Sequence, residues 1–358
     1  MSLSIGIVGL PNVGKSSLFN LLTQNCVPAE NYPFCTIDPN VGCVKVPDAR
    51  LDVLAKMSAS AKIIPTMVEF TDIAGIVKDA HKGEGLGNKF LANIREVDAI
   101  CQVVRIFNDP NVIHVSNRVN PKEDKEIIDL ELIMADLDTV TKKLDSSKKS
   151  SRSGLSKEAE AEMKLLESIK AALDSGRFAS SVPVIDDLRP FAKQLNLFTA
   201  KPMMVLLNVD ESTQNTSIDL PNIRPEDICR INVKLEFELQ ALSPEEQKEY
   251  LKELGMTERG LDRFIQKAYS ILELLTFLTT GADETRAWTV RKGTKAPQAA
   301  GVIHTDFEKS FIRAEVISYD DFVSCGGESG ARDQGKLRVE GKDYVMADGD
   351  ICDFKVGV

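Results

Sequence analysis

A glycine-rich loop near the amino terminus constrains the fold of this chain more than any other feature. Residues 5–8 are an apolar run, the stretch GLPNVGKS follows at residues 9–16, and a helical pattern of apolar residues comes next. Strand, loop and helix in this order form a P-loop, whose backbone N–H groups hold phosphates at a helix N-terminus. Lys15 neutralises the β- and γ-phosphates, and Ser16 gives its hydroxyl to Mg²⁺. The pattern predicts an α/β nucleotide-binding fold with a magnesium ion.

Two further segments complete a site for a nucleoside triphosphate. The segment MVEFTDIAG predicts a strand ending in Asp72-x-x-Gly75, where the carboxylate reaches Mg²⁺ through water and the Gly75 amide contacts the γ-phosphate. Between this motif and the P-loop, NYPFCTIDPN offers Thr36 as the hydroxyl of a switch loop that closes over the metal. We therefore expect Ser16, Thr36 and Asp72 around Mg²⁺.

The position after Gly75 bears on hydrolysis. Many small GTPases place there the glutamine that orients the attacking water, but this chain has Ile76, which can neither donate nor accept a hydrogen bond. Hydrolysis must therefore use another polar group, a partner or a cation, or be slow. Asn12 in the P-loop is one candidate, because an asparagine there can help to hold K⁺. His114 is the other, although a lone histidine also serves as a surface or packing residue.

The stretch LLNVDE at residues 206–211 bears on which base is accepted. GTPases read guanine there with Asn-Lys-x-Asp, but here a valine replaces the lysine and Glu211 replaces the aspartate. The aspartate accepts from two guanine donors in a contact of about 1.5–3 kcal/mol, or roughly 10- to 150-fold in affinity. The extra methylene of Glu211 lets its carboxylate overshoot, and Val209 lacks the lysine stem that stacks on the base. These residues predict lost guanine specificity, with apolar contact and Asn208 holding the base.

Residues 122–175 have a charged, helical composition. Apolar residues fall at steps of three and four, and the polar turn DSSKKSSRSGLSKE interrupts them. We expect an antiparallel helical hairpin, inserted into the nucleotide-binding domain, with a basic tip that serves either solubility or contact with RNA phosphates. The seam residues are Ile127, Leu130, Met134, Leu137, Leu144, Leu166 and Leu173, and the tip residues are Lys148, Lys149 and Arg152.

The remaining residues predict a return to the first sheet and then a second, β-rich region. Residues 202–211 have strand character, residues 268–280 read as a buried helix, and strand-like segments follow to the end. The Asp-Gly-Asp turn at residues 348–350 predicts a β-hairpin over residues 345–354.

Composition limits the class of protein. A chain of 358 residues is too long for one compact core and predicts two or three domains. The net charge of −10 argues against a uniformly basic nucleic-acid binder but leaves room for local basic patches. The seven cysteines form no Cys-x-x-Cys pair, which favours reduced thiols. No apolar run is long enough to span a membrane and no signal peptide is recognisable, so we expect a cytoplasmic protein without membrane contact. We expect a monomer.

Several long motifs resemble those of the YchF family, the Obg-like ATPases, a branch of the Obg-related P-loop GTPases. The motifs are GIVGLPNVGKSSLFNLLT, NYPFCTIDPN, FTDIAGIVKDAHKGEGLGNKFLANIREVDAI, NVDE, RAWTV and VIHTDFEKSFIRAEVI. The resemblance runs from about residue 3 to the C-terminus. The family has Asn-x-x-Glu in place of Asn-Lys-x-Asp and an apolar residue after Asp-x-x-Gly, as this chain does. One departure is Asn232-Val233-Lys234 in the last base-contacting loop, where relatives usually have small residues.

The resemblance implies a Ras-like P-loop domain at residues 1–121 and 198–280, the helical hairpin at residues 122–197 and a β-grasp TGS domain at residues 281–358. It also implies a preference for ATP over GTP, Mg²⁺ as the metal with K⁺ as a further cation, and a ribosomal partner contacted through the hairpin and the TGS domain.

The resemblance also implies roles for individual residues. His114 occupies the position of a histidine with a water-orienting role in the family, and Lys15, Gly75 and Asn12 are the other residues expected to assist hydrolysis. The residues expected to bind the nucleotide are Asn12, Val13, Gly14, Lys15, Ser16, Ser17, Phe107, Asn208, Val209, Glu211, Asn232 and Val233.

Three functions are compatible with these residues. The first is a Mg²⁺-dependent ATPase whose switch loops report the γ-phosphate to the hairpin and the TGS domain. The second is a nucleotide-sensing binding module in which hydrolysis is incidental, and the apolar Ile76 keeps that possibility open. The third is a conventional GTPase, which depends on whether Glu211 still accepts from guanine.

Overall fold

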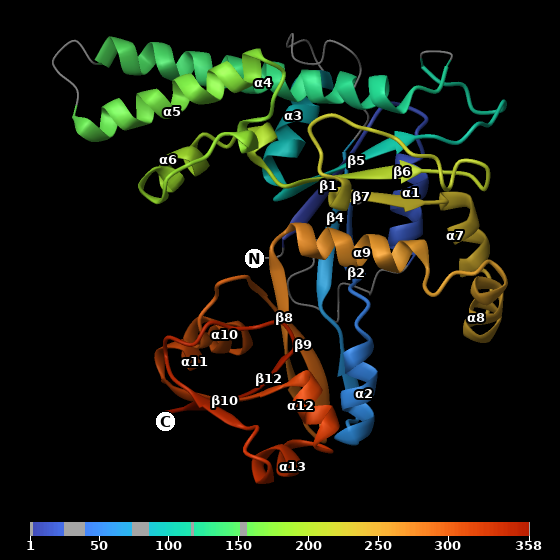
Figure 1. The fold of residues 1–358 in the computed structure, drawn as a ribbon, viewed down its shortest axis with the longest axis vertical. Helices are drawn as coiled ribbons and strands as arrows, with labels where there is room; N and C mark the ends of the chain where they lie inside the picture. Colours follow the sequence, from blue (N-terminus) through green and yellow to red (C-terminus); the bar gives the residue numbers. More distant parts are fainter. Residues whose placement is uncertain (1–2, 25–39, 74–85, 116–117, 151–155, 358) are drawn as a thin grey trace. The chain divides into compact units, whose positions relative to one another are not determined.

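The chain divides into two compact units. The computed structural model describes residues 3–24, 40–73, 86–115, 118–150 and 156–357 (Figure 1). The first unit comprises Met1–Cys43 and Glu69–Phe264, and the second comprises Val44–Val68 and Ile265–Val358. The sequence-based division places residues 44–68 and 265–280 with the nucleotide-binding domain, whereas both segments belong to the second unit.

The first unit is built on a six-stranded sheet with the strand order β2-β4-β1-β5-β6-β7. Strand β1 pairs in parallel with both β4 and β5, and β6 pairs in parallel with β5 and β7. The elements of this unit are β1 (Ser4–Val8), α1 (Lys15–Thr23), β2 (Val41–Lys45), β4 (Met67–Asp72), α3 (Leu86–Glu96), β5 (Ala99–Arg105), α4 (Pro121–Ser150), α5 (Lys157–Asp174), α6 (Arg189–Gln194), β6 (Met203–Asn208), β7 (Ile228–Ile231), α7 (Val233–Gln240), α8 (Pro244–Glu253) and α9 (Gly260–Ile271), with β2, β4 and α9 crossing the boundary between the units. Short 3₁₀ turns lie at Ala179–Ser181, Asp186–Leu188, Phe198–Ala200 and Pro225–Asp227.

The position of β1 in this sheet creates a crevice. Along the chain, β1 is followed by β2 and β4, which lie on one side of it, and then by β5 on its other side. The direction in which strands are added to the sheet therefore reverses at β1. In open α/β sheets, ligands bind beyond the carboxyl ends of the strands at such a reversal. β5 is fully buried along its length and β6 likewise, as expected for parallel strands covered on both faces. The fold is thus the predicted P-loop α/β architecture.

The predicted helical hairpin is present, but its apolar seam differs from the prediction. Helices α4 and α5 lie side by side (Figure 1). Leu166 and Leu173 are buried as expected, whereas Leu130 is 56% exposed and Met134 is 38% exposed. The first half of α4 instead buries charged residues, among them the ion pair between Lys125 and Asp129. The spacing of apolar residues in the sequence cannot predict this burial. A helix face that carries charged residues is normally exposed to solvent, so a buried face made of ion pairs cannot be told from an exposed one.

The second unit has the mixed sheet and packed helices of a β-grasp module. Its strand order is β11-β10-β12-β8-β9-β3, in which β8 pairs antiparallel with β9 and parallel with β12. The elements are α2 (Ala49–Met57), β3 (Lys62–Ile64), β8 (Leu274–Thr280), β9 (Glu284–Arg291), α10 (Ala296–Ile303), α11 (Thr305–Lys309), β10 (Phe311–Ser318), α12 (Tyr319–Ser324), α13 (Glu328–Asp333), β11 (Arg338–Glu340) and β12 (Asp350–Val356).

Two hydrophobic clusters cover the two faces of this second sheet. Adjacent residues of a strand point to opposite faces, so Phe277 enters the cluster with α10 while Leu278 enters the cluster with α2. Leu51 and Leu54 supply the contacts from α2. The early segment Val44–Val68 therefore belongs to this unit because its helix covers one sheet face and β3 extends the sheet edge.

Two predictions for this region are wrong. Residues 268–280 are not one helix, because α9 ends at Ile271 and β8 begins at Leu274. Glu273 adopts a left-handed backbone conformation, with φ of 55°, which ends the helical path. Residues 345–354 do not form a hairpin, because β12 pairs with β10 and β8, while Val345 makes an isolated bridge to Lys295. No helix in the described part of the chain is both long and apolar enough to cross a bilayer.

Candidate nucleotide-binding site

The P-loop joins β1 to α1 in a shape that only glycine permits at its last position. Gly14 caps α1 with φ of 98°, and a Cβ atom there would lie 2.4 Å from the Asn208 side-chain nitrogen. Lys15 follows, buried, with its Nζ donating to the Leu10 carbonyl at 2.8 Å. Burial lowers the pKa of Lys15, and the negative charge of Asp72 acts against this shift. The P-loop thus holds a desolvated cation near its own backbone.

The metal side of the site joins the P-loop to the end of β4. The Ser16 hydroxyl lies beside the Asp72 carboxylate. Burial raises the pKa of Asp72, while the charge of Lys15 and the hydrogen bond from Ser16 act to lower it. The Asp72 Oδ1 atom is buried and has no hydrogen-bond partner within the described residues. This arrangement leaves a carboxylate oxygen available beside a hydroxyl and a lysine.

The base side of the site begins where β6 ends, at Asn208. The Asn208 side chain donates from Nδ2 to the Val13 carbonyl at 3.0 Å and accepts at Oδ1 from the Val233 amide at 3.5 Å. The backbone carbonyl of Asn208 accepts a hydrogen bond from the Ile106 amide at 2.9 Å. Asn232 caps α7 by accepting a hydrogen bond from the Leu235 amide, and this helix starts beside Asn208. Asn208 therefore ties the P-loop to the base-binding loops.

The two acidic residues after Val209 differ in their availability. Asp210 accepts from the Asn108 amide at 3.0 Å, from the Ser212 hydroxyl at 2.7 Å and from Thr213. Although burial acts to raise the pKa of Asp210, these hydrogen bonds lower it to about 2. Glu211 is exposed and lines the cavity described below. Glu211 is therefore the carboxylate in this loop that is placed to meet a base.

Val209 and Phe107 flank the base loop in different ways. Val209 is 2% exposed and packs in a cluster with residues of β5 and β6, so its side chain belongs to the core beneath the loop. Phe107 follows β5, half-buried, with its ring centroid 4.3 Å from the Arg105 guanidinium carbon. An aromatic ring held from behind in this way offers a flat face to a planar base.

These residues surround one cavity of about 970 Å³. This is the size of a small-molecule or cofactor site. Each residue predicted to bind nucleotide lines it except Val13, which lies in the core and contributes its carbonyl to Asn208. The cavity is also lined by Lys234 of the last base-contacting loop and by residues that the sequence did not single out, which are Asn108, Asp109, Val112, Asp210, Ser212, Phe237 and Glu238. Phe237 lies one turn beyond the α7 cap, and that spacing is the signal that could have found it.

His114 does not line the cavity. Its side chain is 3% exposed, and its Nε2 atom lies 2.9 Å from Asp124 Oδ2 in the first turn of α4. Burial raises the pKa of Asp124, while the neighbouring His114 acts to lower it. Asn12 has a left-handed φ of 62° and donates from Nδ2 to the Ile113 carbonyl at 3.0 Å. The P-loop thus touches the loop that carries His114, while the imidazole points to the hairpin helix.

Several predicted residues lie outside the described part of the chain. They are Thr36, Gly75, Ile76 and Arg152. Lys148 and Lys149 of the predicted basic tip lie in the last turn of α4.

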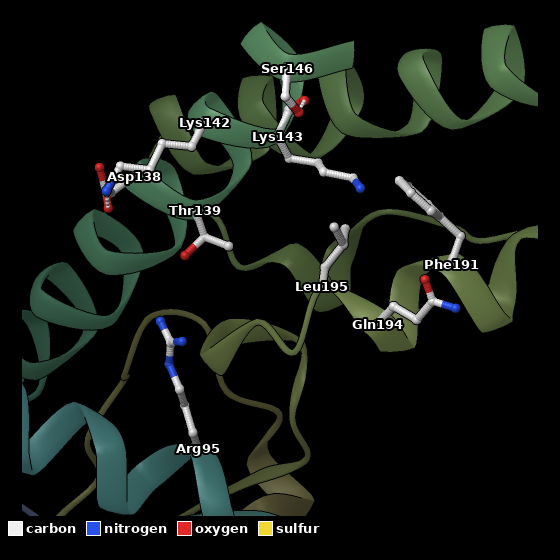
Figure 2. A pocket seen from close by; sticks show the side chains of 9 residues that line it. All are labelled: Arg95, Asp138, Thr139, Lys142, Lys143, Ser146, Phe191, Gln194 and Leu195. Atoms are coloured by element: carbon white, nitrogen blue, oxygen red, sulfur yellow. Dashed lines mark hydrogen bonds and ion pairs between the residues drawn. The ribbon is translucent and has the colours of Figure 1, made fainter. Parts of the chain in front are cut away.

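A second cavity, of about 550 Å³, lies between α4, α6 and the end of α3 (Figure 2). Lys143 projects from α4 toward Phe191, with Nζ 5.7 Å from the ring centroid, and Arg95 rises from the opposite side. Lys142 is engaged with Asp138 at 2.6 Å. The other lining residues are Thr139, Ser146, Gln194 and Leu195. Cations, hydroxyls and an aromatic ring thus face one space under the hairpin.

Comparison with known proteins agrees with this geometry. A family model described as 50S ribosome-binding GTPase matches residues 4–143, and a carboxyl-terminal YchF GTPase model, described as a protein of unknown function, matches residues 274–357. The chain is 48% identical to the ribosome-binding ATPase YchF of Bacillus subtilis, with 100% of both chains covered. It is 45% identical to the protein of that name in Escherichia coli O157:H7, again with 100% of both covered.

A solved structure extends the similarity to the fold. The structure of the Schizosaccharomyces pombe YchF GTPase matches with a TM-score of 0.88 at 38% identity, covering 99% of this chain and 98% of that chain. The similarity therefore extends along the whole chain and includes the P-loop, the hairpin and the β-grasp unit. With full-length relatives at nearly half identity and a P-loop joined to an Asn-x-x-Glu base loop, the chain belongs to the YchF family.

Proposed function

We propose that this protein is a Mg²⁺-dependent ATPase that binds ATP in preference to GTP and uses its nucleotide state to regulate contact with the ribosome in the cytoplasm. The observation that carries the proposal is the base loop. Asp210 already accepts hydrogen bonds from its own and the neighbouring loop, so Glu211 is the exposed carboxylate of the base loop that we propose meets the base. Guanine selection requires a carboxylate held in register with two donors, and an exposed glutamate does not provide one.

The residues around Asp72 fit a magnesium ion. A buried carboxylate oxygen without a partner is costly unless a cation or water meets it, and the Ser16 hydroxyl lies beside the same carboxylate. In the described residues no three His, Cys, Asp or Glu side chains form a metal site of their own. Mg²⁺ is commonly held by one or two protein ligands together with phosphate oxygens and waters. Bound there, it would neutralise charge on the β- and γ-phosphates.

The chain's own residues account for positioning of the nucleotide. Lys15 places a cation at the phosphates, and the α1 N-terminus points its amides at them. Asn208, Phe107 and α7 enclose the base. Asn12 is the residue we propose for K⁺, because its amide nitrogen is engaged with Ile113 and its amide oxygen is the ligand atom that is left. Replacing K⁺ by Na⁺ should then slow hydrolysis in the wild type but not in Asn12→Ala.

The test of base preference is titration calorimetry with Mg-ATP and Mg-GTP. In the wild type we expect the dissociation constant for ATP to be about tenfold or more below that for GTP. In Glu211→Asp we expect the difference between the two dissociation constants to be smaller. Val209→Lys is unsuitable as a partner change, because it would place a charge in the buried cluster that Val209 occupies. Glu249→Asp, at an exposed position on α8, is the matched control. Tighter binding of GTP by the wild type would make the protein a conventional GTPase.

A second candidate function is supported by the position of His114. An imidazole that is 3% exposed and bound to Asp124 cannot orient water in the cavity without turning. A nucleotide-sensing module with incidental hydrolysis fits that arrangement. Turnover that is stimulated by ribosomes and lost in His114→Ala supports the ATPase. A His114→Ala variant that still releases ribosomes on exchange of ATP for ADP supports the module.

The proposed ribosomal partner is supported by the names of the relatives and by the cavity under the hairpin. The relatives from Bacillus subtilis and Escherichia coli are named ribosome-binding ATPases. Arg95 and Lys143 offer cations to phosphates, and Phe191 offers a face on which an unpaired base can stack (Figure 2). We propose this cavity, rather than the tip alone, as the RNA contact of the hairpin.

A further inference from the structure

One arginine is buried directly behind the wall of the nucleotide cavity. Arg105 ends β5 and is 1% exposed. Its guanidinium donates to four backbone carbonyls, which are those of Phe107 at 3.1 Å, Val112 at 2.9 Å, Asp109 at 3.2 Å and Asn12 at 3.5 Å. The first three carbonyls belong to the loop after β5, and the fourth belongs to the P-loop.

The cost of burying this charge argues for a specific purpose. Within the described residues, no carboxylate lies in ion-pair range of the Arg105 guanidinium, and Asp124 acts on it only from a longer distance, so carbonyl dipoles supply its direct contacts. A well-packed apolar side chain is often as stabilising as a buried charge, or more so. A guanidinium differs in offering five N–H groups in a fixed plane, which can hold several carbonyls of an irregular loop at once. Between β5 and α4, residues 106–115 and 118–120 form no helix or strand.

The partners of Arg105 share one property. Asn12, Phe107, Asp109 and Val112 all line the nucleotide cavity, whereas Arg105 does not. Arg105 also stands opposite Asn208 in the β5–β6 register. The arginine therefore touches the phosphate side through the Asn12 carbonyl and the base side through Phe107, from a position that the nucleotide cannot reach.

The strained backbone of Asn12 strengthens this link. A non-glycine residue with φ of 62° requires support from its surroundings. Asn12 receives it on two sides, since its carbonyl accepts from Arg105 and its amide nitrogen donates to the Ile113 carbonyl. Both contacts lead to the same loop after β5.

We propose that Arg105 is a positioning residue that fixes the P-loop and the base wall as one rigid receptor for ATP. This inference rests on the proposed function only in requiring that the cavity bind the nucleotide. Without the guanidinium fork, the loop after β5 loses three anchors and Phe107 loses the group that holds its ring. The nucleotide must then order both walls as it binds, which weakens its affinity.

The test compares Arg105→Lys and Arg105→Gln with the wild type by titration with Mg-ATP and by single-turnover hydrolysis. Each variant is measured well below its own Tm, where it is fully folded. A lysine at this position keeps the charge but not the fork, so we expect the dissociation constant to rise about fivefold in Arg105→Lys and at least tenfold in Arg105→Gln. The matched control is Arg50→Lys, another hydrogen-bonded arginine, in the second unit, whose partners are Asp48 and Asp348.

The results separate this inference from the proposed function. If the wild type fails to bind ATP, the function is wrong. If the wild type binds, and both Arg105 variants bind within twofold of it while only their Tm falls, Arg105 has a structural role alone and the inference is overturned. Should both variants fail to fold, hydrogen exchange on the nucleotide-free wild type decides. The Phe107 and Val112 amides, bonded to Asn208 and Asp109, are expected to be protected, and exchange at unstructured rates would overturn the proposal.

Discussion

The two cavities of the first unit obtain their shape from different sources. The nucleotide cavity is formed by strand ends and backbone, with Lys15, Asn208 and Val233 all buried and hydrogen-bonded into their places. The cavity under the hairpin is formed by long side chains that reach out from helix surfaces, such as Lys143 and Arg95, both exposed.

This difference indicates two kinds of recognition. A receptor whose groups are held before binding loses little conformational entropy on binding and rejects ligands that do not match. A receptor made of exposed lysine and arginine side chains adapts its shape, loses that entropy at each contact, and attracts phosphates mainly by charge. The nucleotide cavity therefore suits one defined small ligand, and the hairpin cavity suits a flexible, polyanionic strand.

The largest effect is expected from Lys15→Met. The change removes the buried cation of the nucleotide cavity and its hydrogen bond to Leu10. Removing one preorganised donor from a developing negative charge costs on the order of 10²–10³ in turnover, so hydrolysis of ATP should fall at least about 100-fold. Phosphate release measures it, with Lys248→Met, on the exposed face of α8, as control. A loss below tenfold would mean that Lys15 does not reach the phosphates.

Asp72→Asn should impair magnesium binding and stabilise the nucleotide-free protein. Burial raises the pKa of Asp72 in the folded state, so its ionised form is less favourable there than in the unfolded chain. This cost is fully present above the folded pKa and disappears as pH falls below the ordinary value of about 3.9. At pH 7 the neutral asparagine should therefore raise Tm without nucleotide.

Two measurements check the Asp72 prediction. Scanning calorimetry from pH 7 downward should show the Tm advantage of Asp72→Asn shrinking as Asp72 becomes protonated in the wild type. Titration with Mg-ATP should show affinity that is lower by about tenfold and less dependent on Mg²⁺. A lower Tm for Asp72→Asn at pH 7 would show instead that the ionised carboxylate stabilises the apoprotein.

The predicted residues that a local motif encodes are the ones that the structure brings to one cavity. The P-loop residues, Asn208 and Glu211 each sit in a short stretch whose spacing is set by a phosphate or a base, and all but Val13 of the residues predicted to bind nucleotide line one cavity. Arg105 and Phe237 could not be found in this way. Each depends on which segments meet after folding, and an arginine at the end of a strand reads as a surface residue until its burial is known.

The errors in the fold have a similar cause. Apolar residues at 268–280 satisfy a helix and a buried strand equally, and only the left-handed Glu273 separates α9 from β8. The segment Val44–Val68 joins the second unit through packing of α2 and the edge pairing of β3 with β9, contacts more than two hundred residues apart in sequence. No local pattern carries such information.

A moderate effect is expected from a charge reversal under the hairpin. Lys143→Glu combined with Phe191→Ala removes one cation and the ring that faces it. We expect ribosome affinity to fall about tenfold, with a shallower dependence on salt, because fewer phosphates are neutralised. Co-sedimentation over a salt series measures this, with Lys164→Glu on α5 as the control and basal ATP hydrolysis unchanged. If the double variant and the Lys164→Glu control lose ribosome affinity equally, the effect comes from the net charge of the protein rather than from the cavity.

The smallest effect, and the sharpest contrast between the cavities, is expected from Asp138→Asn. Asp138 pairs with Lys142 at 2.6 Å, but the two side chains are 62% and 75% exposed, and such pairs contribute about 0–1 kcal/mol to stability. Tm should therefore change little. Because the substitution removes a negative charge from the cavity and releases Lys142, ribosome affinity should rise about twofold at low salt and return to the wild-type value as salt screens the site. An affinity that falls would mean that the Asp138–Lys142 pair is held in place for recognition, and the hairpin cavity would then be preorganised like the nucleotide cavity.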